Sequence, residues 1–125
     1  MNGGCIMYDQ NNIFAKILRG EVPCQKITQN QYFLSFYDIA PKAPIHALVI
    51  PTGSYQNAHD FSDKASPDEI TGFYKGVNDT LDVLGLKANG YRLISNTGLH
   101  GRQDVPHFHI HILAGHDLGP KMVTS

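Results

Sequence analysis

The segment from His107 to Leu113 constrains the fold of this chain more than any other, because histidines alternate in it with apolar residues. In a β-strand, successive side chains point to opposite faces of the sheet. A strand over this segment therefore carries three imidazoles on one face, those of His107, His109 and His111. The apolar residues between them can pack into a core from the other face, namely Phe108, Ile110 and Ile112.

Three interpretations of this histidine face are open. The first is an exposed strand with polar residues, although neighbouring imidazoles disfavour one another once they are charged. The second is a zinc site, since His-x-His presents two imidazoles to one ion. Residues i and i+4 of an extended strand lie about 13 Å apart, so His107 and His111 share a metal only if the strand bends sharply. No Glu or Cys nearby in the sequence completes a ligand set, and we predict no metal and no cofactor.

The third interpretation, covalent catalysis at phosphorus, fits the pattern best. One histidine can attack phosphorus while its neighbours on the same face hold the non-bridging oxygens and transfer protons. Imidazole is neutral and nucleophilic near pH 7. The phosphorus–nitrogen bond that it forms is reactive enough for water to cleave in a second step. The segment therefore predicts a hydrolase with a histidine-bound intermediate.

Length and charge predict one domain with small partners. A chain of 125 residues is long enough for a single core. Ten basic and eleven acidic residues give a net charge of −1, which creates no field to attract a nucleic-acid polymer. No window has the length of a membrane span and residues 1–10 lack a signal peptide, so we expect a cytoplasmic protein with no membrane partner. Cys5 and Cys24 match no metal or redox spacing and are expected to be incidental.

Two helices are predicted. Residues 1–11 are expected to form a flexible tail before a single domain over residues 12–125. Asn12 can cap a short helix over 13–19. A long helix is predicted over 67–84, because Ser66-Pro67-Asp68-Glu69 forms a capping box and Gly85 ends the apolar period. We expect the aromatic residues of that helix to pack in the core, Phe73 and Tyr74.

Strands are predicted on either side of the long helix. A hairpin is expected from 24–28 and 32–37, a doubly covered strand at 45–50, and a further strand at 91–95 before the histidine strand. The polar stretch 51–65 is expected to be a loop. Strands in hairpins with segregated helices indicate an antiparallel α+β domain.

Several motifs of the chain together resemble those of a known family. The run His107-Phe108-His109-Ile110-His111-Ile112-Leu113 matches the signature of the histidine triad (HIT) proteins. Residues 12–23 and 36–51, together with Asn96, are similar to the Hint branch of that family, the nucleoside phosphoramidases. The resemblance covers roughly residues 12–115, and separated motifs in the same order make it specific.

The resemblance implies a HIT-like five-stranded antiparallel sheet with two helices in each subunit of a two-fold dimer. It implies a hydrolase that cleaves adenosine or guanosine 5′-phosphoramidates, or related nucleotidyl conjugates, through a nucleotidyl-histidine intermediate. The partner would then be a purine nucleotide resembling AMP or GMP. A nucleotide-binding regulatory module with little catalysis is the alternative.

The resemblance implies roles for particular residues. His109 is the implied nucleophile and His111 contacts the phosphate, while His107 and His46 complete a polar network. Asp38 matches the family's ribose-binding carboxylate, and this role suits an ionised acid, since it can accept from two vicinal hydroxyls. Asn96 falls on the phosphate side. The implied walls of the base pocket are Ile13, Phe14, Ile17, Phe36, Ile39 and Leu48.

Each of these residues also has a structural explanation. Asp38 and Asn96 could be turn residues, and His46 a core histidine. The apolar wall residues could belong to the ordinary core. The other histidines are expected to face solvent, namely His59, His100 and His116.

The chain departs from the Hint pattern just before the triad. Arg102-Gln103-Asp104-Val105 stands where the family runs Gly-Gln, then Ser or Thr, then Val. All of Arg102, Gln103 and Asp104 remain candidate nucleotide contacts. Asp104 replaces a hydroxyl that is expected to contact the phosphate or the leaving group, and a carboxylate there repels a phosphoryl oxygen unless it is paired. Arg102 is the candidate compensating cation. Residues 115–120 lack the tryptophan found there in some relatives, so the resemblance does not indicate which leaving group is preferred.

Overall fold

Five strands form one antiparallel sheet in the computed structural model, which describes residues 7–121. The strands lie in the order β1 (Lys26–Gln29), β2 (Phe33–Tyr37), β3 (Ile45–Pro51), β5 (Ile110–Ala114) and β4 (Arg92–Ile94). The helices of the described residues are α1 (Ile13–Leu18), α2 (Ala58–Lys64) and α3 (Pro67–Leu84). The sheet confirms the predicted α+β fold, but the prediction of two helices was wrong by one.

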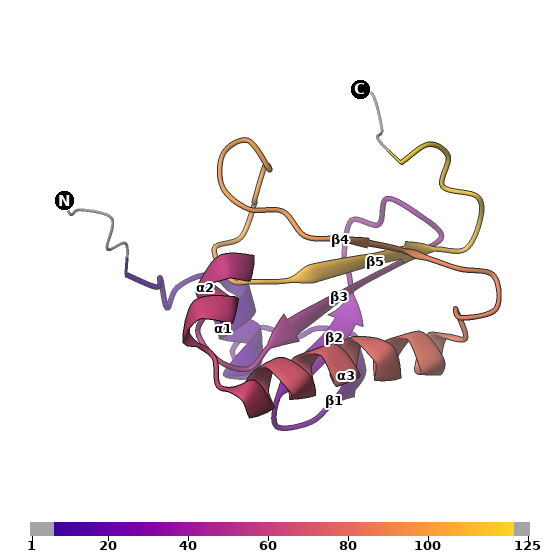
Figure 1. Cartoon of the computed structure of the whole chain (residues 1–125). Helices are drawn as coiled ribbons and strands as arrows, with labels where there is room; N and C mark the ends of the chain where they lie inside the picture. The colour runs from indigo at the N-terminus through magenta and orange to yellow at the C-terminus, as the bar shows by residue number, and fades with distance from the viewer. Residues whose placement is uncertain (1–6, 122–125) are drawn as a thin grey trace.

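The long helix α3 covers one face of the sheet, along which it runs in Figure 1. The expected capping box is present, since Ser66 accepts from the amide of Glu69 and Glu69 accepts from that of Ser66. Gly76 allows a close approach to the sheet, because a Cβ there would lie 2.3 Å from the ring of Phe33. Phe73 is buried as predicted. Tyr74 is 51% exposed, which corrects the expectation that it packs in the core, because the helix turns it toward solvent.

The short helix α1 covers part of the opposite face. Its Phe14 packs in a cluster with residues that alternate along β2 and β3, namely Leu34, Phe36, Leu48 and Ile50. The residues between them face α3 instead, among them Ala47 and Val49. With only six residues, α1 leaves the neighbouring part of this face to the side chains of His46 and His111.

Helix α2 corrects the prediction of a loop over 51–65. Asn57 caps it by accepting from the amide of Asp60, and Phe61 is its buried residue. The Phe61 ring stacks on Phe108 at a centroid distance of 5.1 Å and meets Phe73 at 5.2 Å. A helix of seven residues with one core side chain shows no helical period in its sequence, which explains why the pattern missed it.

The histidine strand is shorter than predicted, because β5 begins only at Ile110. The chain before it is held by the amide of Phe108, which donates to the carbonyl of Tyr55 at 2.7 Å. The two faces still separate as the sequence predicts: Phe108, Ile110 and Ile112 lie in the core under α3. Other strand ends differ from the predictions by one or two residues, the usual uncertainty of element boundaries.

Other predictions concern single residues. His59, His100 and His116 are exposed, as expected. Cys24 is a partly buried free cysteine packed against the α1 cluster, and Cys5 lies outside the described residues. No helix within residues 7–121 is long and apolar enough to cross a membrane.

Candidate active site

His109 carries its proton on one ring nitrogen and an available lone pair on the other. Its Nδ1 lies 2.7 Å from the backbone carbonyl of His107. A carbonyl can only accept, so Nδ1 holds the proton and donates it, which leaves the lone pair on Nε2. The ring is buried and packs edge-on against Phe14 at a centroid distance of 5.0 Å. His109 is thereby held in the tautomer that a nucleophile at Nε2 requires.

His107 has both ring nitrogens engaged. Its Nε2 donates to the carbonyl of Pro51 at 2.9 Å, so its Nδ1 carries the lone pair and accepts from the hydroxyl of Tyr8. The ring is completely buried, and this burial lowers its pKa to about 4. His107 therefore has no nitrogen free for substrate and acts on the site through its backbone carbonyl.

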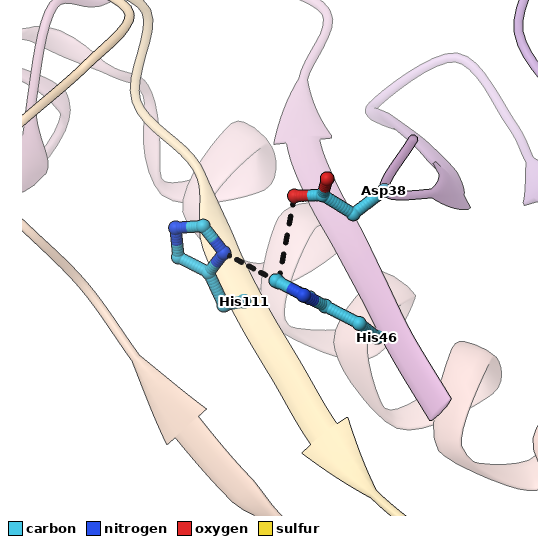
Figure 2. A group of neighbouring side chains, drawn as sticks. All are labelled: Asp38, His46 and His111. Carbon is cyan, nitrogen blue, oxygen red and sulfur yellow. Dashed lines mark hydrogen bonds and ion pairs between the residues drawn. The ribbon is translucent and has the colours of Figure 1, made fainter. Parts of the chain in front are cut away.

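His46 and His111 form a hydrogen-bonded pair across β3 and β5, with Asp38 beside them (Figure 2). The amide of Lys42 donates to Nδ1 of His46 at 3.0 Å, so the His46 proton lies on Nε2. That nitrogen is 2.9 Å from Nδ1 of His111 and 3.5 Å from Oδ2 of Asp38. Because Nδ1 of His111 accepts, its Nε2 carries a proton. Figure 2 shows this second nitrogen on the side of the ring away from His46.

Burial keeps these imidazoles neutral at pH 7. It lowers the pKa of His46 and of His109, and it lowers the pKa of His111 to about 4 with the help of its neighbours His109 and His46. The carboxylates of Asp38 and Asp104 act in the opposite direction on His109 and His111, without reversing the shift. The site therefore presents lone pairs and N–H donors, not imidazolium charges.

The distances within this cluster would suit a metal ion, but the positions of its protons would not. Three potential ligand atoms lie within 4.8 Å of one another, one each from Asp38, His46 and His111. These residues come from three separate segments, so the spacing of residues along one strand does not reveal the set. A ligating His46 Nε2 must first give up its proton. The Lys42 amide already occupies Nδ1, so that proton cannot move there without loss of the hydrogen bond. The donor set therefore suits a hydrogen-bonded pair better than an ion.

The loop before the triad is held by two of the predicted contact residues. Nδ2 of Asn96 donates to the carbonyl of Gly101 at 2.8 Å. Nε2 of Gln103 donates to the carbonyls of Gln56 and Val105 at 2.6 and 2.9 Å, while its Oε1 accepts from Gly98 at 3.3 Å. The amides of Asn96 and Gln103 thus shape the loop.

Arg102 and Asp104 are both exposed. Arg102 has a φ of 57°, a left-handed conformation that is uncommon for a residue with a Cβ. Among the ion pairs within residues 7–121, none joins Arg102 to Asp104. The compensating pair suggested by the sequence is therefore not formed, and Asp104, which has no ion-pair partner in the described part of the chain, acts on His109 and His111.

The predicted nucleotide-pocket residues divide between surface and core. Ile39 is 100% exposed and Ile13 is partly so. Ile17 is partly buried, whereas the remaining wall residues belong to the α1 cluster, namely Phe14, Phe36 and Leu48. Asp38 is oriented by the amide of Ala40, which donates to its Oδ1 at 2.8 Å.

Sequence reasoning missed the groups that set the tautomers. The amide of Lys42 and the carbonyl of Pro51 are backbone atoms, which carry no residue-specific signal. Tyr8 lies in the segment predicted as a tail, yet its hydroxyl contacts a triad histidine 99 residues away. An aromatic residue just before a helix cap was the available signal.

Comparison with known proteins gives concordant results. The model of the HIT domain family matches residues 19–118. An uncharacterised HIT-like protein of Azospirillum brasilense is 49% identical over 94% of this chain and 96% of its own. The purine nucleoside phosphoramidase of Escherichia coli is 38% identical over 90% of this chain and 94% of its own. A histidine triad protein from Clostridium difficile superposes with a TM-score of 0.82 at 36% identity, covering 93% of this chain and all of the other. A family match over most of the chain, together with relatives of this similarity, shows that the chain belongs to the HIT family.

Proposed function

We propose that this protein hydrolyses purine nucleoside 5′-phosphoramidates, or related nucleotidyl conjugates, through a nucleotidyl intermediate on His109. The observation that carries the proposal is the hydrogen bond from Nδ1 of His109 to the carbonyl of His107, since it directs the lone pair to Nε2. The similarity to a protein named purine nucleoside phosphoramidase supports this substrate class.

The first step forms one bond and breaks another at phosphorus. Nε2 of His109 attacks, a bond between phosphorus and this nitrogen forms, and the bond between phosphorus and the substrate's amine breaks. The amine leaves with the electron pair of that bond and takes a proton from water. The Nδ1–H of His109 stays on the His107 carbonyl, which stabilises the positive charge that develops on the ring.

In the second step water attacks the same phosphorus. The bond to Nε2 breaks, the proton of the water passes to solvent, and a nucleoside 5′-monophosphate leaves as neutral His109 is restored. His111 carries a proton on Nε2 and donates it as a hydrogen bond to a non-bridging oxygen in both steps. The His46 N–H on the other side of that ring fixes this orientation.

Asp38 and Ile39 supply the nucleoside contacts in this proposal. The half-buried Asp38 accepts from the ribose hydroxyls, while Ile39 has a fully exposed side chain that a purine base can cover. Phe14 lies between the apolar α1 cluster and the proposed nucleophile, because it belongs to that cluster and its ring contacts His109.

One observation favours a second candidate function, a nucleotide-binding module with little catalysis. Asp104, which has no ion-pair partner within residues 7–121, acts on both His109 and His111 and stands where the family resemblance places a hydroxyl, so the site lacks a donor that would assist the departing amine. Single-turnover hydrolysis of adenosine 5′-phosphoramidate, measured beside an AMP-binding titration, decides between the two. Turnover supports the hydrolase, whereas AMP binding without turnover selects the module.

We also propose that the protein is a two-fold dimer joined along the edge strand β4. Tyr91, the residue just before β4, and Leu93, within it, are each 43% exposed. The other edge strand, β1, exposes Lys26 and Gln29 at its ends instead. An apolar edge strand needs a partner to cover it, and a second copy offers a matching one.

A further inference from the structure

The segment just before α1 is folded into a turn and tied to the end of that helix by a compact set of hydrogen bonds. The carbonyl of Asp9 accepts from the backbone amide of Asn12 at 3.2 Å and from its side chain at 2.7 Å. Oδ1 of Asp9 accepts from the amide of Asn11 at 2.9 Å, and Arg19 donates to the carbonyl of Gln10 at 2.8 Å. This turn fixes Tyr8 beside the triad.

The Tyr8 ring meets His107 edge-on at a centroid distance of 5.6 Å, and its hydroxyl reaches Nδ1 of that histidine. Because Nε2 of His107 donates to Pro51, Nδ1 is an acceptor and the tyrosine O–H is the donor. Partial burial raises the pKa of Tyr8, so the hydroxyl keeps its proton throughout the neutral range.

His107 is thus held at three points. One ring nitrogen accepts from Tyr8, the other donates to Pro51, and the backbone carbonyl accepts from Nδ1 of His109. In the alternative His107 tautomer Nδ1 would donate to the Tyr8 oxygen, and the bond from Nε2 to Pro51 would be lost. The Pro51 carbonyl, which can only accept, therefore selects the tautomer, and the tyrosine hydroxyl donates to the Nδ1 lone pair that this tautomer leaves.

We propose that Tyr8 is a positioning residue for the reaction, which acts through His107 to hold the carbonyl that orients the nucleophile His109. The inference rests on the proposed function, in which His109 attacks from Nε2. Tyr8 touches no reacting atom. Its contribution is to keep the His107 carbonyl in line with Nδ1 of His109 as positive charge develops on that ring.

The test compares Tyr8→Phe with Tyr55→Phe. Both changes remove one partly buried hydroxyl from a packed ring, but the Tyr55 hydroxyl donates to Glu69 on α3 and not to a histidine. We expect the single-turnover rate with adenosine 5′-phosphoramidate to fall about tenfold in Tyr8→Phe, with the AMP dissociation constant within twofold of wild type. Tyr55→Phe should leave the rate unchanged.

Nitrogen-15 NMR of the histidine rings provides a readout that does not depend on activity. In the wild type we expect His107 to be protonated at Nε2 and to accept a hydrogen bond at Nδ1. In Tyr8→Phe the Nδ1 resonance should move toward that of a free lone pair, while Tyr55→Phe leaves it in place. If Tyr8→Phe does not fold, the wild-type spectrum still decides, since a proton on Nδ1 of His107 overturns the proposal.

Each other outcome also counts. An unchanged rate in Tyr8→Phe, an AMP affinity that falls as much as the rate, or an unmoved Nδ1 resonance would each refute the positioning role. If the wild-type enzyme binds AMP but releases no product, the proposed hydrolysis fails. The NMR comparison then decides alone whether Tyr8 fixes His107.

Discussion

His109 combines a protonated Nδ1 with an unprotonated Nε2, so replacing it separates catalysis from binding. We expect His109→Ala to retain the fold and AMP affinity within a few-fold while its turnover falls by at least about a thousandfold, because the variant lacks only the attacking nitrogen. Single-turnover assays and AMP titration check this. His100→Ala, at an exposed position outside the triad, is the matched control and should remain fully active. Normal multiple-turnover rates in His109→Ala would exclude the assignment.

Asp104 offers a change that should raise activity. Its carboxylate has no ion-pair partner among the described residues and acts on His109 and His111. Removing a repulsion worth roughly 1–2 kcal/mol should make Asp104→Ser about tenfold more efficient, measured as kcat/KM with adenosine phosphoramidate.

Arg102 provides the comparison for this prediction. If substrate binding brings the Arg102 guanidinium onto Asp104, then Arg102→Ala becomes the damaging change and Asp104→Ser gives no gain. The double variant separates the cases, because coupled residues give non-additive effects. An Asp104→Ser enzyme no faster than wild type would defeat the repulsion hypothesis.

At the scale of elements, the site depends on how β3 and β5 meet. Register places His46 opposite Leu113 and His111 opposite Leu48, which brings the two imidazoles within hydrogen-bonding distance on one face. Since this pair retains its protons, we expect dialysis against a strong chelator to leave hydrolysis unchanged. Elemental analysis of the dialysed and untreated protein should show no stoichiometric zinc. Activity that returns only with added metal would instead assign Asp38, His46 and His111 as ligands.

The elements that the sequence predicts well are those with a long period or a strong cap. The capping box at Ser66 and the alternation around His109 are local patterns, and both describe the folded chain correctly. Helix α2 has one core residue, Phe61, and is stabilised by contacts with Phe73 and Phe108 that are remote in sequence. Tertiary packing of this kind leaves no local pattern.

The site, too, is partly predictable from local sequence patterns and partly determined by tertiary structure. Side chains with distinctive chemistry, such as those of the triad, can be found from spacing. The tautomers depend on two backbone groups, the carbonyl of Pro51 and the amide of Lys42. Any residue at position 51 would supply the carbonyl, and any residue except proline at position 42 would supply the amide. Spacing alone therefore predicts which imidazoles gather, while the fold determines which nitrogen is free.

At the scale of the whole molecule, the buried histidines make stability depend on pH. The pKa of His107 is about 4 in the folded chain and about 6.5 when unfolded, so the unfolded chain binds the proton first as the pH falls. The stabilisation is present above pH 6.5 and is lost between about pH 6.5 and pH 4, by about 3 kcal/mol for His107 alone. His111, whose pKa is also about 4, acts in the same direction.

Urea unfolding at pH 7.5 and pH 4.5 measures this effect. We expect a lower midpoint at pH 4.5, and the same loss in His100→Ala, because an exposed histidine does not contribute to the shift. Equal midpoints at the two pH values would contradict the burial of neutral imidazoles.

The association of two chains concerns the edge of the sheet. A dimer joined along β4 would cover Leu93, which is 43% exposed although it lies in a strand beside buried Ile112. A charge at that position would be buried without a partner in the dimer but solvated in the monomer, so we expect Leu93→Glu to shift the protein to monomers. Light scattering at micromolar concentration measures the mass. Val83→Glu, an equally charged change at an exposed position near the end of α3, is the control and should leave the dimer intact. A wild-type monomer would refute the dimer, and a Leu93→Glu dimer as stable as wild type would place the contact elsewhere than β4.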